Sequence, residues 1–172
     1  MKSTSNNIRY LAIHPTTYGL GYALFEGAFR LLDWGTYRAK RDKNQNCFLF
    51  LGVLIRRYEP HVVLFEDRGP RERQRSERIR HFIRAATIYF RRYGITAKRV
   101  SRRRMQTFFE GQGATTKQEI AIRITELFPE LSQDLPPKRK AWMPEHPRMG
   151  TFEALAIALT YFGTRDSNSK NP

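Results

Sequence analysis

The stretch of sequence that decides the fold is YLAIHPTTYGLGYALF, residues 10–25. Its first apolar run ends at one polar residue, His14, and a short turn of proline and threonine leads to a second apolar run opened by Gly19 and Gly21. Two apolar runs joined by a short turn predict a β-hairpin, and glycines in a strand permit close approach of another backbone. The hairpin therefore places His14 at the end of a strand, at the mouth of a sheet.

The next segments extend this hairpin into a sheet and add a helix. Residues 29–37 (FRLLDWGTY) alternate well enough to predict a third antiparallel strand. Apolar residues at three- and four-residue steps within residues 47–58 predict an amphipathic helix. Residues 61–66 (HVVLFE) form a continuous apolar run, which is typical of a strand buried on both faces. A pair of carboxylates, Glu66 and Asp67, lies at its carboxyl end.

The second half of the chain is richer in helices. Apolar residues within 79–90 define one face of a basic helix, and residues 94–100 predict a short strand with a helix after it. A capping box at residues 116–119 opens a further helix. The strongly apolar segment 148–162 predicts a closing helix, whose single carboxylate needs a partner such as a metal or an arginine.

Length and composition suit one compact domain. The chain has 172 residues, of which 40% are hydrophobic and 13% aromatic, as in ordinary globular proteins. We expect a single domain over residues 1–163, followed by a flexible polar tail, residues 164–172. The only cysteine, Cys47, excludes an intramolecular disulfide and a cysteine-based zinc site.

The charge of the chain is strongly unbalanced. Thirty-one Lys and Arg face 16 Asp and Glu, which gives a net charge of +15. Such an excess attracts polyanions, and neutralising phosphates releases counterions. A membrane surface is the competing polyanion, but the sequence has no long basic amphipathic helix with an unbroken apolar face and no lipidation signal. The composition therefore favours nucleic acid over a membrane, and a cytoplasmic, nucleoid-associated location.

Basic residues gather in a few segments that predict phosphate contacts. Arginine, which dominates residues 71–92, favours bidentate phosphate binding, although a solvated helix face would look the same. Lys117 is expected in the first turn of a helix, where free N–H groups also favour a phosphate. Trp142, beside three cations, could stack on an unpaired base or cover the core. The candidate nucleic-acid-binding residues are Arg71, Arg73, Arg75, Arg80, Arg84, Arg102, Arg103, Arg104, Lys117, Lys138, Arg139, Lys140 and Trp142.

In this order, the motifs resemble the RuvC branch of the ribonuclease-H-like superfamily. The resemblance covers nearly the whole chain and rests on four segments: residues 11–23 (LAIHPTTYGLGYA), 62–66 (VVLFE), 115–119 (TTKQE) and 152–159 (FEALAIAL). It implies an α/β ribonuclease-H-like fold, with a mixed five-stranded sheet, its first three strands antiparallel, and helices on both faces.

The resemblance also implies an activity. Members of the family are metal-dependent nucleases, and the best known cut four-way DNA junctions as symmetric dimers. Two Mg²⁺ ions about 4 Å apart hold the scissile phosphate and activate water. Their ligands are a bridging carboxylate from the first strand, a second from the fourth strand and one or two from the last helix. A preference for branched DNA and a homodimer are implied by the resemblance alone.

This sequence departs from the family pattern in its metal ligands. His14 stands where the family has the bridging aspartate, and an imidazole nitrogen cannot bridge two ions as a carboxylate does. Glu153 replaces the aspartate of the last helix, and Gly150 stands one turn earlier, where another ligand is common. The candidate catalytic residues are His14, Glu66 and Glu153, and Asp67 joins them as a candidate metal ligand.

Three interpretations remain open. In the first, the catalytic site is impaired and the protein is a nucleic-acid-binding, RuvC-like module without a cofactor. In the second, the protein cuts DNA with one metal bound by His14, Glu66 and Glu153, and the imidazole favours Mn²⁺ over Mg²⁺. In the third, the protein acts in assembly, with its arginines facing an acidic partner.

Overall fold

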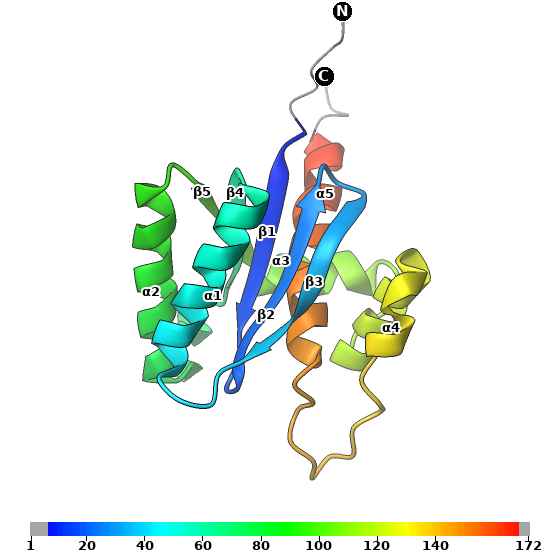
Figure 1. The fold of residues 1–172 in the computed structure, drawn as a ribbon. Helices are drawn as coiled ribbons and strands as arrows, with labels where there is room; N and C mark the ends of the chain where they lie inside the picture. Colours follow the sequence, from blue (N-terminus) through cyan, green and yellow to red (C-terminus); the bar gives the residue numbers. More distant parts are fainter. Residues whose placement is uncertain (1–6, 169–172) are drawn as a thin grey trace, which may run out of the picture.

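A mixed five-stranded sheet in the order β3-β2-β1-β4-β5 forms the centre of the computed structural model, which describes residues 7–168 (Figure 1). Strands β1 (Arg9–Pro15), β2 (Gly19–Glu26) and β3 (Arg30–Arg38) are antiparallel neighbours. Strands β4 (Val62–Asp67) and β5 (Thr96–Ser101) continue the sheet in parallel beyond β1. The predicted sheet, with its antiparallel first three strands, is confirmed.

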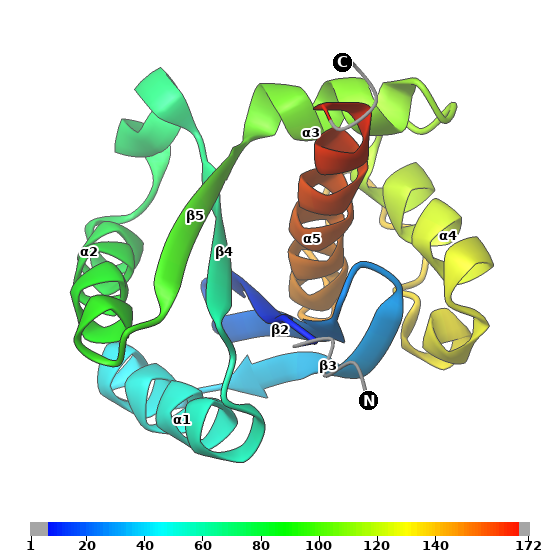
Figure 2. The same cartoon turned by 90° about the horizontal axis from the view of Figure 1, so that it is seen from above.

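Helices cover both faces of the sheet (Figure 2). One face carries α1 (Lys43–Tyr58) and α2 (Glu77–Arg92). The other carries α5 (Met149–Asn168), with α3 (Arg102–Glu110) and α4 (Lys117–Leu127) beside it. Two short 3₁₀ helices complete the chain, η1 (Gly69–Gln74) before α2 and η2 (Pro129–Asp134) after α4. No helix among the described residues is long and apolar enough to cross a lipid bilayer.

Two hydrophobic cores lie on opposite sides of β1. Successive side chains of a strand point to opposite faces, so Leu11 and Ile13 pack against α1 and α2, whereas Tyr10 and Ala12 pack against the α5 side. Both cores are closed by fully buried aromatic residues. The central strand is thus buried on both faces, which fixes the end of β1, and with it His14, relative to the neighbouring helices.

The last helix extends beyond residue 162, where the sequence predicted its end. Helix α5 continues to Asn168, and the Thr164 hydroxyl donates a hydrogen bond to the Thr160 carbonyl within it. Gly163 does not end the helix but permits contact with α3, since a Cβ there would lie 2.3 Å from Cε2 of Phe108. Residues 169–172 of the predicted tail lie outside the described part of the chain.

The beginning of α5 touches the hairpin directly. A Cβ on Gly21 of β2 would lie 2.1 Å from the carbonyl carbon of Gly150. The Thr36 hydroxyl on the edge strand β3 lies 2.8 Å from the Thr151 hydroxyl, and this hydrogen bond connects the sheet to the same turn of α5. This close approach brings Glu153, one turn further along α5, next to the end of β1.

Candidate functional site

Three elements bring the candidate catalytic side chains together. His14 is the penultimate residue of β1, Glu66 lies near the end of β4, and Glu153 lies in the first turns of α5. Their exposed fractions are 6%, 2% and 6%, so all three are buried. Because β1 and β4 are parallel neighbours, their carboxyl ends lie at the same edge of the sheet. The three residues that the sequence analysis grouped as candidate catalytic residues thus lie at the same end of the sheet.

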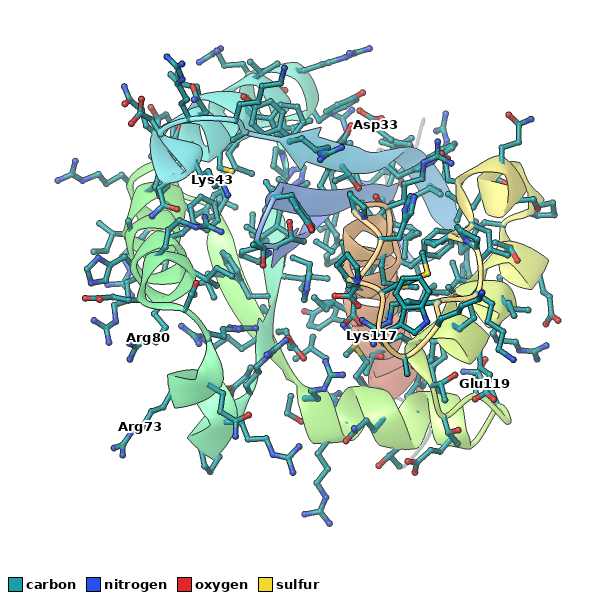
Figure 3. The ribbon with its side chains drawn as sticks, turned by 90° about the horizontal axis from the view of Figure 1, so that it is seen from below. Asp33, Lys43, Arg73, Arg80, Lys117 and Glu119 are labelled. Carbon is teal, nitrogen blue, oxygen red and sulfur yellow. The ribbon has the colours of Figure 1, made fainter. Side chains whose placement is uncertain are left out.

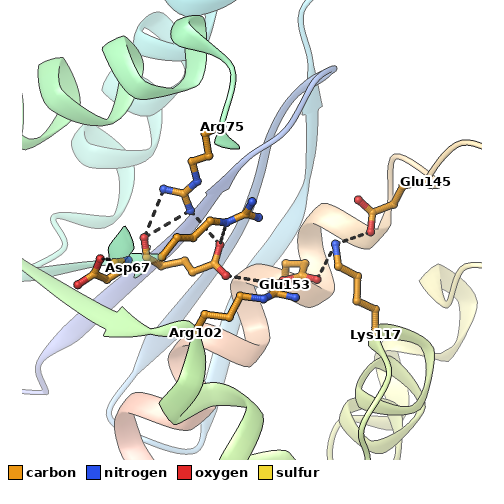
Figure 4. Close-up of polar contacts among 9 residues, drawn as sticks. Asp67, Arg75, Arg102, Lys117, Glu145 and Glu153 are labelled. Atoms are coloured by element: carbon orange, nitrogen blue, oxygen red, sulfur yellow. Dashed lines mark hydrogen bonds and ion pairs between the residues drawn. The ribbon is translucent and has the colours of Figure 1, made fainter. Parts of the chain in front are cut away.

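Glu66 is enclosed by three arginines, of which Figure 4 labels Arg75 and Arg102. Its Oε2 accepts hydrogen bonds from Nε of Arg68 at 2.9 Å and from Nη2 of Arg75 at 2.8 Å, and its Oε1 accepts one from Nη1 of Arg102 at 2.7 Å. Arg75 also donates to the main-chain carbonyl of Glu66. The side chains of Glu66 and Arg75 are only 1% and 4% exposed, so this is a buried ion pair.

Glu153 has cationic partners as well. Nζ of Lys117 lies 3.0 Å from its Oε1, and Nη1 of Arg102 lies 3.7 Å from its Oε2. Lys117 simultaneously contacts Oε1 of Glu145 at 2.6 Å, which ties the loop before α5 to the cluster. Arg102 therefore connects both buried carboxylates, and Lys117 connects Glu153 to the surface.

These contacts set the charge state of the site. Burial alone would raise the pKa of Glu66, but the positive charge that His14 carries when it is protonated at low pH, the hydrogen bond from Arg102 and the charge of Arg68 outweigh it and lower that pKa to about 2. The pKa of Glu153 is likewise lowered, because His14, Lys117 and Arg102 outweigh its burial. Burial lowers the pKa of His14. At neutral pH the site therefore holds two carboxylates, a neutral imidazole and their cationic partners.

The donor set does not fit Mg²⁺ or Mn²⁺. Such ions need several free oxygen ligands, whereas the oxygens of Glu66 and Glu153 already face guanidinium and ammonium groups. Asp67 is also engaged, since its Oδ1 accepts a hydrogen bond from the Gly69 amide at 2.8 Å, and strand alternation turns it away from Glu66. Within residues 7–168, no three His, Cys, Asp or Glu side chains are grouped to hold a metal ion. The structure thus does not assemble the metal site predicted from His14, Glu66, Glu153 and Asp67.

Three of the predicted phosphate-binding residues are internal partners of these carboxylates. Arg75 is buried, and Arg102 and Lys117 are half-buried with their charged ends directed at Glu66 and Glu153. In the sequence, Arg75 and Arg102 looked like members of basic runs. Their partners come from β4 and α5, which only the folded chain brings near.

The backbone amides at the beginning of α4, which the sequence analysis expected to favour a phosphate, have a partner within the chain. The helix is capped by its own residues, since Oε2 of Glu119 accepts hydrogen bonds from the amides of Thr115 at 2.8 Å and Thr116 at 2.9 Å. These backbone hydrogen bonds lower the pKa of Glu119 to about 2. The predicted capping box is confirmed, and its carboxylate occupies the place proposed for a phosphate.

The basic stretch 71–92 divides into two elements. Ser76 caps α2 by accepting a hydrogen bond from the Ile79 amide, so the helix begins at Glu77. Arg73 therefore lies in η1, outside the helix that carries Arg80 and Arg84. Figure 3 shows Arg73 on the outside of the molecule and Lys117 further inward.

Most of the other predicted nucleic-acid-binding residues are exposed to solvent. Trp142 is 77% exposed, with Nζ of Lys140 located 5.8 Å from its ring centroid, so it does not cover the core. Arg80 is half-buried. The remaining candidates are all exposed: Arg71, Arg73, Arg84, Arg103, Arg104, Lys138, Arg139 and Lys140.

Two residues of the cluster were not predicted from the sequence. Arg68 follows Glu66 by two residues, and this period-two spacing along a strand could have indicated a shared face. Glu145 lies in an irregular loop, where no periodicity indicates which way a side chain points.

Comparisons with known proteins agree with this architecture. No family model and no curated protein matches the sequence. Among solved structures, Thermus thermophilus RuvC in complex with a Holliday junction substrate matches with a TM-score of 0.64 at 17% identity, over 93% of this chain and 96% of that chain. The yeast mitochondrial Holliday junction resolvase Ydc2 gives a TM-score of 0.57 at 11% identity, over 91% and 78% of the two chains.

A viral structure belongs to the same set. Fowlpox virus resolvase, in complex with Holliday junction DNA, matches with a TM-score of 0.52 at 14% identity, over 90% of this chain and 99% of that chain. These similarities extend over nearly the whole chain, as the sequence motifs do. The chain therefore has the RuvC-like form of the ribonuclease-H-like fold.

Proposed function

We propose that this protein binds branched or structured DNA and does not cut it. The observation that carries the proposal is the arrangement of Arg68, Arg75 and Arg102 around Glu66, which leaves the carboxylate no free oxygen for a metal ion. The exposed cations supply the sequence-independent attraction to phosphates. The preference for branched DNA is supported by the structural neighbours RuvC and fowlpox resolvase, which were solved with junction DNA.

The cationic partners of the two buried glutamates support binding of DNA rather than its hydrolysis. Nuclease activity in this fold needs a water activated by a divalent ion and negative ligands that hold this ion. Here the negative charge of Glu66 and Glu153 is balanced by the protein's own cations. The interpretation as an active enzyme using His14, Glu66 and Glu153 is therefore the less supported one.

A cleavage assay tests the catalytic half of the proposal. We expect wild type and His14→Asp to leave labelled four-way junctions, flaps and single strands uncut in Mg²⁺ and in Mn²⁺. His14→Asp adds a third carboxylate but leaves the surrounding cations in place. Product is measured on denaturing gels, with an active junction resolvase as the positive control. Wild-type cutting that disappears in Glu66→Gln would establish the active enzyme instead.

A salt titration tests the binding half. We expect junction affinity to fall steeply with salt, and the triple variant Lys138→Ala, Arg139→Ala, Lys140→Ala to lower the slope of log K against log salt by about 3. A matched variant with Lys138→Arg and Lys140→Arg keeps the charge and should keep the slope. Fluorescence anisotropy with junction, duplex and single-stranded DNA gives the slopes and the preference. Salt-independent affinity would contradict the proposal and favour assembly with an acidic protein partner.

The proposed binding unit is a homodimer located in the cytoplasm at the nucleoid. This part rests on the resemblance to junction-cutting dimers, since a four-way junction presents symmetric arms. Light scattering of the free protein and of its junction complex measures the subunit number.

A further inference from the structure

A cleft of about 370 Å³ opens beside the carboxylate cluster. Its walls come from the β1–β2 turn, the segment between η1 and α2, the beginning of α4 and the loop before α5. Three cationic side chains, Arg68, Arg75 and Lys117, line it together with a single carboxylate, Glu145. Cations thus outnumber anions in the lining, and the cleft is large enough for a small polar ligand.

Arg68 presents an unoccupied guanidinium edge in this cleft. Its Nε is fixed by the hydrogen bond to Oε2 of Glu66, and its side chain is 27% exposed. Its two Nη nitrogens have no hydrogen-bond partner among the described residues. A guanidinium that is oriented by a carboxylate on one side and free on the other can bind an oxyanion with two parallel hydrogen bonds.

His14 provides a second, independent indication of a ligand. The side chain lines the same cleft and is 6% exposed, yet its Nδ1 has no hydrogen-bond partner within the described chain. Buried polar atoms almost always have a partner, so an atom without one points to a missing ligand or an ordered water. A neutral imidazole can donate one hydrogen bond from Nδ1.

We propose that this cleft binds a phosphate group directly and without a metal ion, through the free edge of Arg68, the ammonium of Lys117 and Nδ1 of His14. The inference rests on the proposed function and adds to it the way in which the phosphate is held. Cationic side chains of the protein take the place of divalent ions. The phosphate can belong to a DNA backbone or to a small phosphorylated molecule.

Glu145 allows a test in which substitutions in the same cleft have opposite effects on phosphate binding. Its carboxylate lies in the cleft lining and holds Lys117 at 2.6 Å, where it competes with a bound phosphate. Removing its charge should strengthen phosphate binding, whereas removing the charge of Arg68 or Lys117 should weaken it. A purely structural role of these residues would not produce opposite effects, since loss of an ion pair can only loosen the loop.

The test measures junction binding by anisotropy in EDTA. Arg68→Ala and Lys117→Ala should each weaken binding about tenfold and reduce the salt slope by about 1, and Glu145→Gln should strengthen binding several-fold. Arg30→Ala serves as the matched control, because this exposed arginine lies at the opposite end of the hairpin and pairs with Glu26. Its affinity should change by less than twofold.

A second experiment identifies the kind of molecule to which the bound phosphate belongs. Inorganic phosphate and a mononucleotide are added to the protein without DNA, and Tm is recorded for wild type and Arg68→Ala. A Tm increase that Arg68→Ala abolishes, with unchanged junction affinity, assigns the cleft to a small phosphate. Weakened junction binding by the same variant assigns it to the DNA backbone. Either result supports phosphate binding.

The proposal and the function on which it rests can fail separately. If wild type binds no nucleic acid, the proposed function is wrong. If wild type binds junctions but Arg68→Ala and Glu145→Gln change neither affinity nor the response to phosphate, the cleft proposal is overturned and DNA binding stands. Junction binding that EDTA abolishes would also overturn the cleft proposal, because the phosphate would then need a metal.

Discussion

Glu66→Gln is expected to destabilise the fold by about 3–5 kcal/mol, the cost of removing one member of a buried ion pair. The substitution keeps the size of the side chain but removes the buried negative charge that faces Arg75, whose side chain is 4% exposed. Arg68 and Arg102 lose the same partner. In a metal site, by contrast, removing a carboxylate would relieve repulsion in the metal-free protein. Urea denaturation gives the difference in the free energy of unfolding.

The matched control for this prediction is Glu126→Gln. Glu126 also pairs with an arginine, Arg123, but both side chains are about half exposed, so the change should cost less than about 1 kcal/mol. The double variant Glu66→Gln, Arg75→Met should cost less than the sum of the single variants, since the two side chains are in direct contact and each single variant loses the same ion pair. A Glu66→Gln protein as stable as wild type, or a wild type whose Tm rises with Mn²⁺ and falls with EDTA, would contradict a structural role for the cluster.

Gly21→Ala is the second substitution with a large expected effect. It should lower the free energy of unfolding by about 3 kcal/mol or more, because the added methyl group overpacks the contact between β2 and α5. The added Cβ would lie 2.1 Å from the backbone carbon and oxygen of Gly150. Because these are backbone atoms, the clash cannot be relieved by rotating a side chain, and β2 or α5 would have to shift. The shift of α5 would also move Glu153 away from Lys117 and Arg102. Thermal unfolding with circular dichroism measures the loss of stability.

Gly111→Ala is the control for a harmless added methyl group. Gly111 ends α3 with helical backbone angles, and a Cβ there would be 3.6 Å from the nearest atom, an ordinary contact. This variant should be neutral or slightly more stable, because alanine restricts the unfolded chain. Equal stability of the two variants would show that β2 and α5 do not approach as closely as described.

Local patterns were sufficient for much of the fold. The hairpin around residues 10–25 and the apolar strand that ends at Glu66 were predicted from periodicity and turn chemistry, which act between near neighbours in the chain. The end of α5 was wrong because Gly163 reads as a helix stop in sequence, whereas in the structure its missing side chain makes room for Phe108.

The candidate site was predictable only in part. The positions of His14, Glu66 and Glu153 follow from the ends of the elements that carry them. The arginine partners of Glu66 were not predicted, because burial of a carboxylate can be balanced by a metal or by arginines, and the sequence does not say which. The exposure of Trp142 could not be predicted either, because the sequence of a loop does not indicate whether an aromatic side chain packs into the core or lies on the surface.

By itself, the sequence determined the strands, the helices and the strongly basic character, because alternation, helical spacing and charge are properties of short segments. Its resemblance to the RuvC branch implied the overall architecture and the convergence of His14 with two glutamates. Only the tertiary structure decided which cations face solvent and which face Glu66. Arg102 lies 36 positions from Glu66, and Lys117 belongs to another helix, yet both end in the cluster. Distances between such remote segments are set by packing of the whole chain, and they turn a predicted metal site into a network of ion pairs.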